Sequence, residues 1–112
     1  MNIQIYALKR NFDVQKAERY FKERRIPYQF VDLSRRPFSP REMESVRQRV
    51  PLDELADTQS DAWKESPAAY TRDDSIISEI LCQNPRLLRT PIVRCGKLAT
   101  AGYRPEVWET WK

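Results

Sequence analysis

The chemistry open to this 112-residue sequence is limited first by a missing side chain, because the chain contains no histidine. Serine–histidine and cysteine–histidine catalysis and histidine-ligated zinc sites are therefore excluded. Two thiols remain, Cys82 and Cys95, at a spacing that matches neither a CxxC redox motif nor a zinc ribbon. The two glycines, Gly96 and Gly102, cannot form a dinucleotide fingerprint or a phosphate-cradling loop.

Each thiol has a structural and a chemical interpretation. Cys82 lies near the end of an isoleucine-rich segment, which favours a buried structural role. Cys95 precedes the turn Gly96-Lys97, where Arg94 and Lys97 favour a thiolate. If the protein is an enzyme, Cys95 is therefore the candidate catalytic thiol. Replacing it with serine should then abolish turnover in a glutathione- or thioredoxin-coupled assay.

The net charge of +4 is unevenly distributed along the chain. Residues 1–50 carry 12 basic and 6 acidic side chains, residues 51–85 carry 2 and 8, and residues 86–112 carry 6 and 2. If the basic ends lie side by side they favour an anionic ligand, whereas solvated helix faces are the simpler interpretation. The sequence shows neither the recognition helix nor the aromatic platform that nucleic-acid-binding modules use, so we do not expect direct nucleic-acid binding. We expect a soluble, cytoplasmic protein with reduced thiols, because no apolar run approaches the ~18 residues of a membrane span and no signal peptide is evident.

The first half of the chain has clear structural signals. Alternating polar and apolar side chains predict strands over residues 2–8 and 27–33, with a helix between them that Asp13 would cap. A helical crossover between two strands implies that they pair in parallel. Ser39-Pro40-Arg41-Glu42 has the pattern of a capping box, and its helix should reach about Val50.

The second half begins with an acidic stretch, residues 52–70, for which we predict one or two short helices with loops. A helix capped by Asp73-Asp74-Ser75 should follow and end at Asn84-Pro85, with four core side chains, Ile76, Ile77, Ile80 and Leu81. Residues 91–103 predict an antiparallel hairpin around Gly96-Lys97. Pro105 should start a last helix whose apolar stripe packs against the sheet, namely Val107, Trp108 and Trp111.

Five segments of this sequence resemble the arsenate-reductase-like (ArsC, Spx and YffB) family of thioredoxin-fold proteins. They are residues 6–11, 14–17, 26–32, 84–93 and 102–106. The resemblance implies an α/β, thioredoxin-like fold in which helices flank a central mixed four-stranded sheet. It also implies a single domain over residues 1–112, with a helical insertion at about residues 39–84, between the β-α-β unit and the C-terminal hairpin and helix.

The same resemblance places Asn11 where family enzymes carry their nucleophilic cysteine, and it implies a cis bond between Thr90 and Pro91. Of the three arginines that hold the oxyanion in such enzymes, one is retained as Arg104. Asp57 aligns with another. Thr90 takes the place of the third, with an arginine one position earlier. The family reaction therefore lacks its nucleophile here, and we expect no arsenate reduction by that mechanism.

A noncovalent anion site is the remaining candidate. Its residues lie around the first helix start and the proline segment: Lys9, Arg10, Asn11, Arg89, Thr90, Pro91 and Arg104. The preferred function is a pseudoenzyme with a binding or regulatory role, whose ligand is an anionic small molecule, a thiol such as glutathione, or a protein segment. The alternatives are a thiol-dependent oxidoreductase of the arsenate reductase or glutaredoxin type, and an Spx-like transcription regulator that contacts RNA polymerase. We expect no metal and no resident cofactor.

Overall fold

A computed structural model describes residues 2–111 of the chain. Four strands form one mixed sheet in the order β2-β1-β3-β4. They are β1 (Ile3–Ala7), β2 (Tyr28–Asp32), β3 (Ile92–Cys95) and β4 (Leu98–Ala101). β1 and β2 are parallel, β3 is antiparallel to β1, and β4 is antiparallel to β3. The predicted parallel pair and the predicted hairpin are both confirmed.

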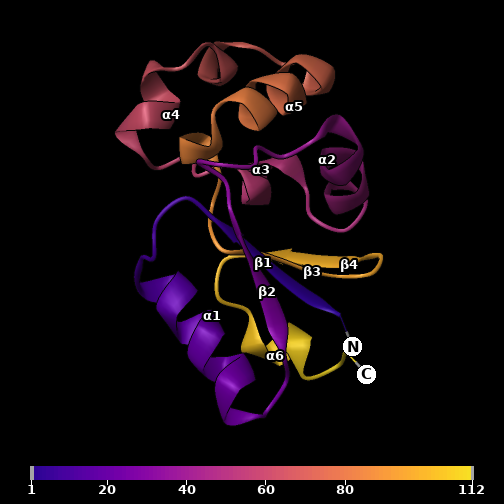
Figure 1. Cartoon of the computed structure of the whole chain (residues 1–112). Coiled ribbons are helices and arrows are strands. Elements are labelled where there is room, and N and C mark those ends of the chain that lie inside the picture. The colour runs from indigo at the N-terminus through magenta and orange to yellow at the C-terminus, as the bar shows by residue number, and fades with distance from the viewer. Residues whose placement is uncertain (1, 112) are drawn as a thin grey trace.

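One face of the sheet is covered by α1 (Phe12–Glu23) and the short α6 (Pro105–Trp108), which lie below the strands in Figure 1. Alternation along β1 directs Ile3 and Ile5 to this side, where they pack with Phe21 and Trp108. The indole nitrogen of Trp108 donates a 2.8 Å hydrogen bond to the buried hydroxyl of Thr100. The predicted packing of the last helix against the sheet is therefore confirmed.

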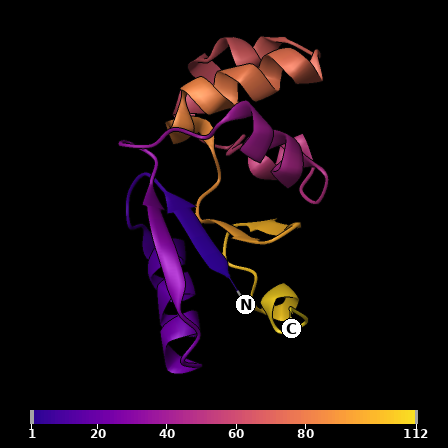
Figure 2. The same ribbon diagram turned by 45° about the vertical axis from the view of Figure 1, so that its right-hand side comes forward.

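The opposite face carries the helical insertion, which forms a separate layer in Figures 1 and 2. Its elements are α2 (Pro40–Arg47), α3 (Leu52–Leu55), α4 (Asp61–Glu65), the 3₁₀ turn η1 (Pro67–Tyr70), α5 (Asp74–Gln83) and the 3₁₀ turn η2 (Pro85–Leu87). Tyr6 and Ile92 face this layer from the sheet and share a core with Met43, Val46 and Leu81. Because successive side chains of a strand point to opposite faces of the sheet, the strands contribute to two separate hydrophobic cores.

The helix ends test the sequence signals directly. The capping box of Ser39 and Glu42 is present, but α2 ends at Arg47, earlier than predicted. The prediction that Asp13 caps the first helix is wrong. Asn11 is the N-cap, because its backbone is extended and its side-chain oxygen accepts a 2.8 Å hydrogen bond from the Val14 amide.

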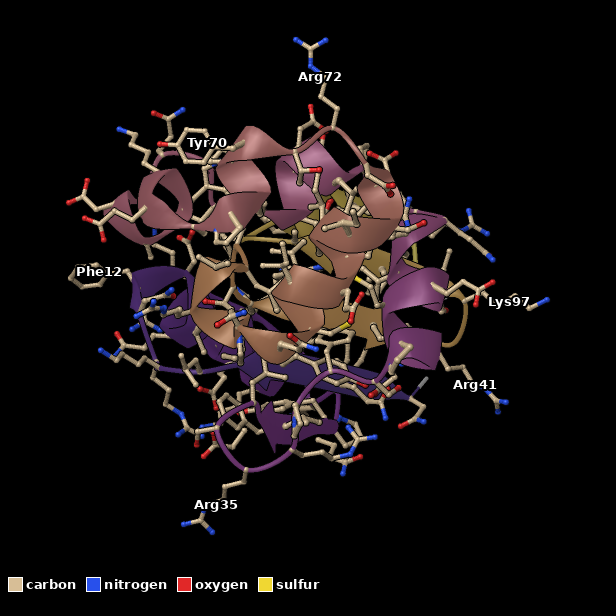
Figure 3. All side chains as sticks on the ribbon, turned by 90° about the horizontal axis from the view of Figure 1, so that it is seen from above. Phe12, Arg35, Arg41, Tyr70, Arg72 and Lys97 are labelled. Atoms are coloured by element: carbon tan, nitrogen blue, oxygen red, sulfur yellow. The ribbon has the colours of Figure 1, made fainter. Side chains whose placement is uncertain are left out.

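The prediction for α5 needs a second correction. Leu81 is fully buried, but Ile76 is 46% exposed and does not belong to the core. α5 lies in the outer layer and buries only one narrow stripe, so a residue one position away from that stripe faces solvent. Phe12 and Tyr70 also point outward, as Figure 3 shows. No helix within residues 2–111 is both long enough and apolar enough to cross a membrane.

Candidate functional site

A pocket of about 460 Å³ opens where β1 leads into α1. Its walls come from the β1–α1 loop, from the insertion and from the segment before β3. The lining residues are Leu8, Lys9, Asn11, Asp13, Asp57, Pro85, Arg86, Leu88, Arg89 and Thr90. Four of the predicted site residues are therefore brought together here, namely Lys9, Asn11, Arg89 and Thr90.

Asn11 connects the two sides of this pocket. Its side-chain nitrogen donates a 3.1 Å hydrogen bond to the hydroxyl of Thr90, while its side-chain oxygen caps α1 at Val14. The peptide bond between Thr90 and Pro91 is cis, and the Pro91 ring is buried behind the pocket wall. The oxygen of the Asn11 carboxamide thus caps α1, and its nitrogen holds the β1–α1 loop against the cis-proline segment.

A short antiparallel bridge fixes the insertion to the same segment. Ala56 pairs with Leu88. The Asp57 amide donates to the Leu87 carbonyl, and the Arg89 amide donates to the Leu55 carbonyl, each at 2.8 Å. The walls that carry Asp57 and Arg89 are therefore tied together through backbone groups. The next residue, Thr90, makes no hydrogen bond through its own amide or carbonyl within residues 2–111.

The pocket carries charges of both signs. Lys9, Arg86 and Arg89 contribute three positive charges, and Asp13 and Asp57 contribute two negative ones. None of the five is within 4.0 Å of an oppositely charged group in the part of the chain that the structure describes. Sequence reasoning did not select Arg86 or Asp13. Arg86 could have been identified as a pocket residue, because it lies close in the sequence to the predicted cis-proline segment.

Two predicted site residues lie elsewhere. The guanidinium of Arg10 forms a 2.9 Å ion pair with Glu18 and stacks 4.0 Å above the ring of Phe30. Arg104 forms a 3.1 Å ion pair with Glu106. Neither arginine lines the pocket, because each has a closer partner on its own side of the sheet.

Both thiols lie outside the pocket as well. Cys95 pairs with Ile3 at the start of β1, whereas the pocket opens beyond the other end of that strand. Cys82 faces α2, with its sulfur 4.0 Å from the Ser39 carbonyl oxygen. Burial raises the pKa of the Cys82 thiol, and the negative charges of Glu42 and Glu79 raise it further. This thiol is therefore poorly disposed to ionise.

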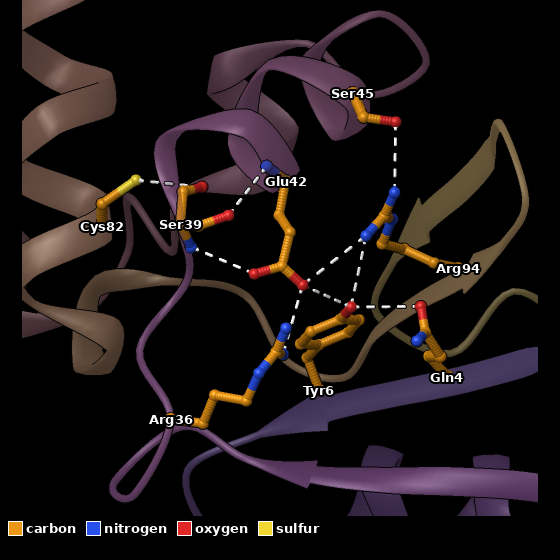
Figure 4. A network of polar contacts seen from close by, with 8 residues as sticks. All are labelled: Gln4, Tyr6, Arg36, Ser39, Glu42, Ser45, Cys82 and Arg94. Atoms are coloured by element: carbon orange, nitrogen blue, oxygen red, sulfur yellow. Dashed lines mark hydrogen bonds and ion pairs between the residues drawn. The ribbon is translucent and has the colours of Figure 1, made fainter.

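A polar network joins the insertion to the sheet, as Figure 4 shows. One carboxylate oxygen of Glu42 accepts from the Tyr6 hydroxyl at 2.7 Å and from Arg36 at 3.2 Å, and it lies 3.6 Å from Arg94. Its other oxygen accepts from the Ser39 amide at 3.1 Å. The sequence analysis did not identify this network. It fixes α2 above β1 and β3, and so helps to place the insertion that forms one pocket wall.

The described residues contain no evident metal-binding site. Among residues 2–111, no three or more histidine, cysteine, aspartate or glutamate side chains are grouped as metal ligands would be. The pocket can offer hydrogen bonds and charges of either sign to a small polar molecule, and its volume falls within the usual range of ligand sites.

Comparison with known proteins gives a consistent picture. The model of the ArsC family matches residues 6–111. No curated protein matches the chain by sequence. Among solved structures, a YFFB protein has a TM-score of 0.84 at 15% identity, covering 96% of each chain. An arsenate reductase from Vibrio cholerae has a TM-score of 0.83 at 19% identity, covering 96% of this chain and 94% of that one.

A more distant structural likeness is to the glutaredoxin-like protein NrdH-redoxin from Escherichia coli. Its TM-score is 0.51 at 17% identity, with 100% of this chain and 96% of that chain covered. At these identities the three structures establish the fold alone. They agree with a thioredoxin-like arrangement of a four-stranded mixed sheet between helices.

Proposed function

Because this chain belongs to the ArsC family, we propose that its pocket binds a ligand noncovalently, with Asn11 in the place of the family's nucleophilic cysteine. The double engagement of the Asn11 carboxamide carries this proposal. One end caps α1, and the other end holds Thr90. An amide in this position is not a nucleophile for arsenic or sulfur. The protein would act as a binding or regulatory member of the family.

The positions of the two thiols support the same proposal. Cys95 lies opposite Ile3, and the four residue steps from Ile3 to Ala7 span ~13 Å along β1. Cys82 lies in the insertion and has a raised pKa. A thiol-dependent oxidoreductase built on this pocket would therefore need its sulfur from another molecule.

The mixed charges favour a zwitterionic, peptide-like ligand over a simple oxyanion. Lys9, Arg86 and Arg89 can receive carboxylates, and the carboxylates of Asp13 and Asp57 can receive an ammonium group. Asp57 also stands where the family resemblance expects an arginine, so it would repel arsenate. Glutathione, with two carboxylates and one ammonium group, has the complementary pattern.

The backbone beside the cis-proline bond offers a further contact. The amide and carbonyl of Thr90 have no hydrogen-bond partner within residues 2–111. An extended peptide-like molecule can pair with such groups as an added strand does. A ligand with its own peptide bonds therefore fits this pocket better than a phosphate or an arsenate ion.

The test is a titration followed by two-dimensional ¹⁵N–¹H NMR. Glutathione should shift the amide resonances of Asn11 and Thr90, and S-methylglutathione should bind equally well, because no bond to sulfur forms. Arg89→Ala should weaken binding about tenfold, as expected for a lost charge-assisted hydrogen bond. Arg35→Ala is the matched control, since Arg35 is 89% exposed and lies outside the pocket.

The proposal would be refuted if neither glutathione form shifted these resonances. It would also be refuted if the purified protein reduced arsenate or a disulfide with its own thiols. Phosphate and arsenate are included as comparisons, and binding of either one more tightly than glutathione would overturn the assigned ligand class.

A regulatory role of the Spx kind is the second candidate, and the outer face of α1 favours it. Lys16, Arg19 and Lys22 are exposed and have no carboxylate within 4.0 Å in the described chain. Such a face suits an acidic protein surface. Purified RNA polymerase should then bind the wild type but not a Lys16→Glu/Arg19→Glu variant, and the lack of binding to the wild type would exclude this role.

A further inference from the structure

A second cavity, of about 880 Å³, lies between α2 and α5 and shares no lining residue with the pocket at α1. The two helices lie side by side in the insertion, in contact with each other (Figures 1 and 2). Phe38 and Met43 line it as buried side chains, together with the half-buried Cys82. Pro37 and Pro40 add exposed apolar edges. We call this cavity the α2–α5 groove.

One polar atom in the groove has no partner. The hydroxyl oxygen of Ser78 is inaccessible to solvent and makes no hydrogen bond within the described residues. Buried hydroxyl groups in proteins nearly always have a partner, so an isolated one needs an explanation. Ser78 lines the groove, so rotation of its side chain would turn the hydroxyl outward, where a polar atom of a bound molecule can supply the missing hydrogen bond.

The rim of the groove is negatively charged. Glu44 and Glu79 both line it, and neither has a cation within 4.0 Å among residues 2–111. Arg47 also lines the groove, but its guanidinium lies 3.8 Å from Asp74, which is not a lining residue, and is thus already paired. Burial raises the pKa of the Cys82 thiol on the groove wall, and the negative charges of Glu42 and then Glu79 raise it further.

We propose that the α2–α5 groove binds a small apolar molecule that carries one amine. The apolar body lies on Phe38 and Met43, and the ammonium group lies between Glu44 and Glu79. The occupant is an amine because a cation satisfies both unpaired glutamates, whereas a carboxylate would be repelled by them. It is a small molecule because α2 and α5 have only eight and ten residues, so the groove is no longer than ~15 Å.

Three probes with the same chain and different head groups test this proposal: decylammonium, decanol and decanoate, each below its micellar concentration. All three share the apolar contacts, so their affinities differ through the head group alone. We expect decylammonium to bind about three- to tenfold more tightly than decanol, and decanoate to bind most weakly. The amide resonances of Ser78 and Cys82 should shift with saturation.

Matched variants locate the charge effect. A Glu44→Gln/Glu79→Gln variant should bind decylammonium no better than decanol. Glu54→Gln, which removes one carboxylate charge from an exposed position on α3 outside the groove, should leave the order unchanged. All three glutamates face solvent, so these variants should fold normally.

A second measurement uses the groove thiol directly. In a Cys95→Ser variant, Cys82 is the remaining thiol, and saturating decylammonium should slow its reaction with a disulfide reagent. The proposal fails if the three probes bind equally, if the double variant keeps the preference for the amine, or if the resonance shifts fall outside α2 and α5. Glutathione binding at the α1 pocket is measured separately and does not bear on any of these outcomes.

Discussion

Replacing Glu42 should destabilise the protein more than replacing any exposed glutamate, because one carboxylate joins three parts of the fold. It accepts hydrogen bonds from Tyr6 on β1 and from the Ser39 amide before α2. It also neutralises Arg36 and Arg94. In Glu42→Ala all of these groups lose an acceptor at once.

The expected loss in the free energy of unfolding follows from the burial of these side chains. The side chains of Glu42 and Arg94 are only 12% and 17% exposed, and the Nε atom of Arg94 already lacks a partner. Removing one member of a buried ion pair costs about 3–5 kcal/mol. These groups keep some solvent contact, so we expect the lower end, about 3 kcal/mol, including the opened capping box. Glu42→Gln keeps the hydrogen-bond geometry but not the charge, and should cost about 1–1.5 kcal/mol.

Urea unfolding at pH 7, followed by circular dichroism and tryptophan fluorescence, measures these free energies. The matched control is Glu44→Ala, on the exposed side of the same helix, which should change the free energy of unfolding by less than about 0.5 kcal/mol. If Glu42→Ala and Glu44→Ala proved equally mild, the network in Figure 4 would not hold the insertion to the sheet.

The same residue gives a pH dependence with a definite sign. Burial alone would raise the pKa of Glu42, but the hydrogen bonds from Tyr6 and Ser39 and the charge of Arg36 outweigh it and lower the pKa. In the unfolded chain the pKa is ordinary, near ~4.3. The carboxylate therefore stabilises the fold fully above that pH, and its contribution is lost as the pH falls through the lower folded value. Wild type and Glu42→Gln should accordingly differ at pH 7 and converge in acid.

Four other substitutions probe the rest of the molecule. Asn11→Cys should gain a thiol that reacts at pH 7 faster than Cys82 or Cys95 in a thiol-reagent assay, because the helix start favours a thiolate; a slow thiol would argue against that environment. Leu81→Ala should cost about 3 kcal/mol in urea unfolding, but Ile76→Ala under about 0.5 kcal/mol. Trp108→Phe should lose about 1–2 kcal/mol by thermal unfolding, because it leaves the Thr100 hydroxyl unpaired; an unchanged midpoint would contradict this.

Features governed by neighbouring residues were predictable from the sequence. Alternation identified β1 and β2, and the Ser39 capping box identified α2. The turn at Gly96, with a φ of +60°, joins β3 to β4 as its residue type indicates. Each of these signals is contained in a few consecutive residues, so tertiary packing did not override them.

Features governed by distant partners were not predictable. Tyr6 and Glu42 are 36 positions apart in the sequence, and Tyr6 and Arg94 are 88 apart. Arg10 was a reasonable anion ligand by position, but Glu18 and Phe30 hold its side chain elsewhere. The position of a charged residue in the sequence predicts which helix, strand or loop carries it. Its ion-pair partner depends on which other side chains the fold brings near.

The bridge between Ala56 and Leu88 also determines how a molecule can enter the α1 pocket. Backbone hydrogen bonds on either side of it join the insertion to the chain that leads into Pro91. The helical layer therefore cannot swing away as a lid without breaking this short ladder. Entry and release instead depend on rotation of the long side chains at the mouth, Lys9, Arg86 and Arg89, which can occur within nanoseconds.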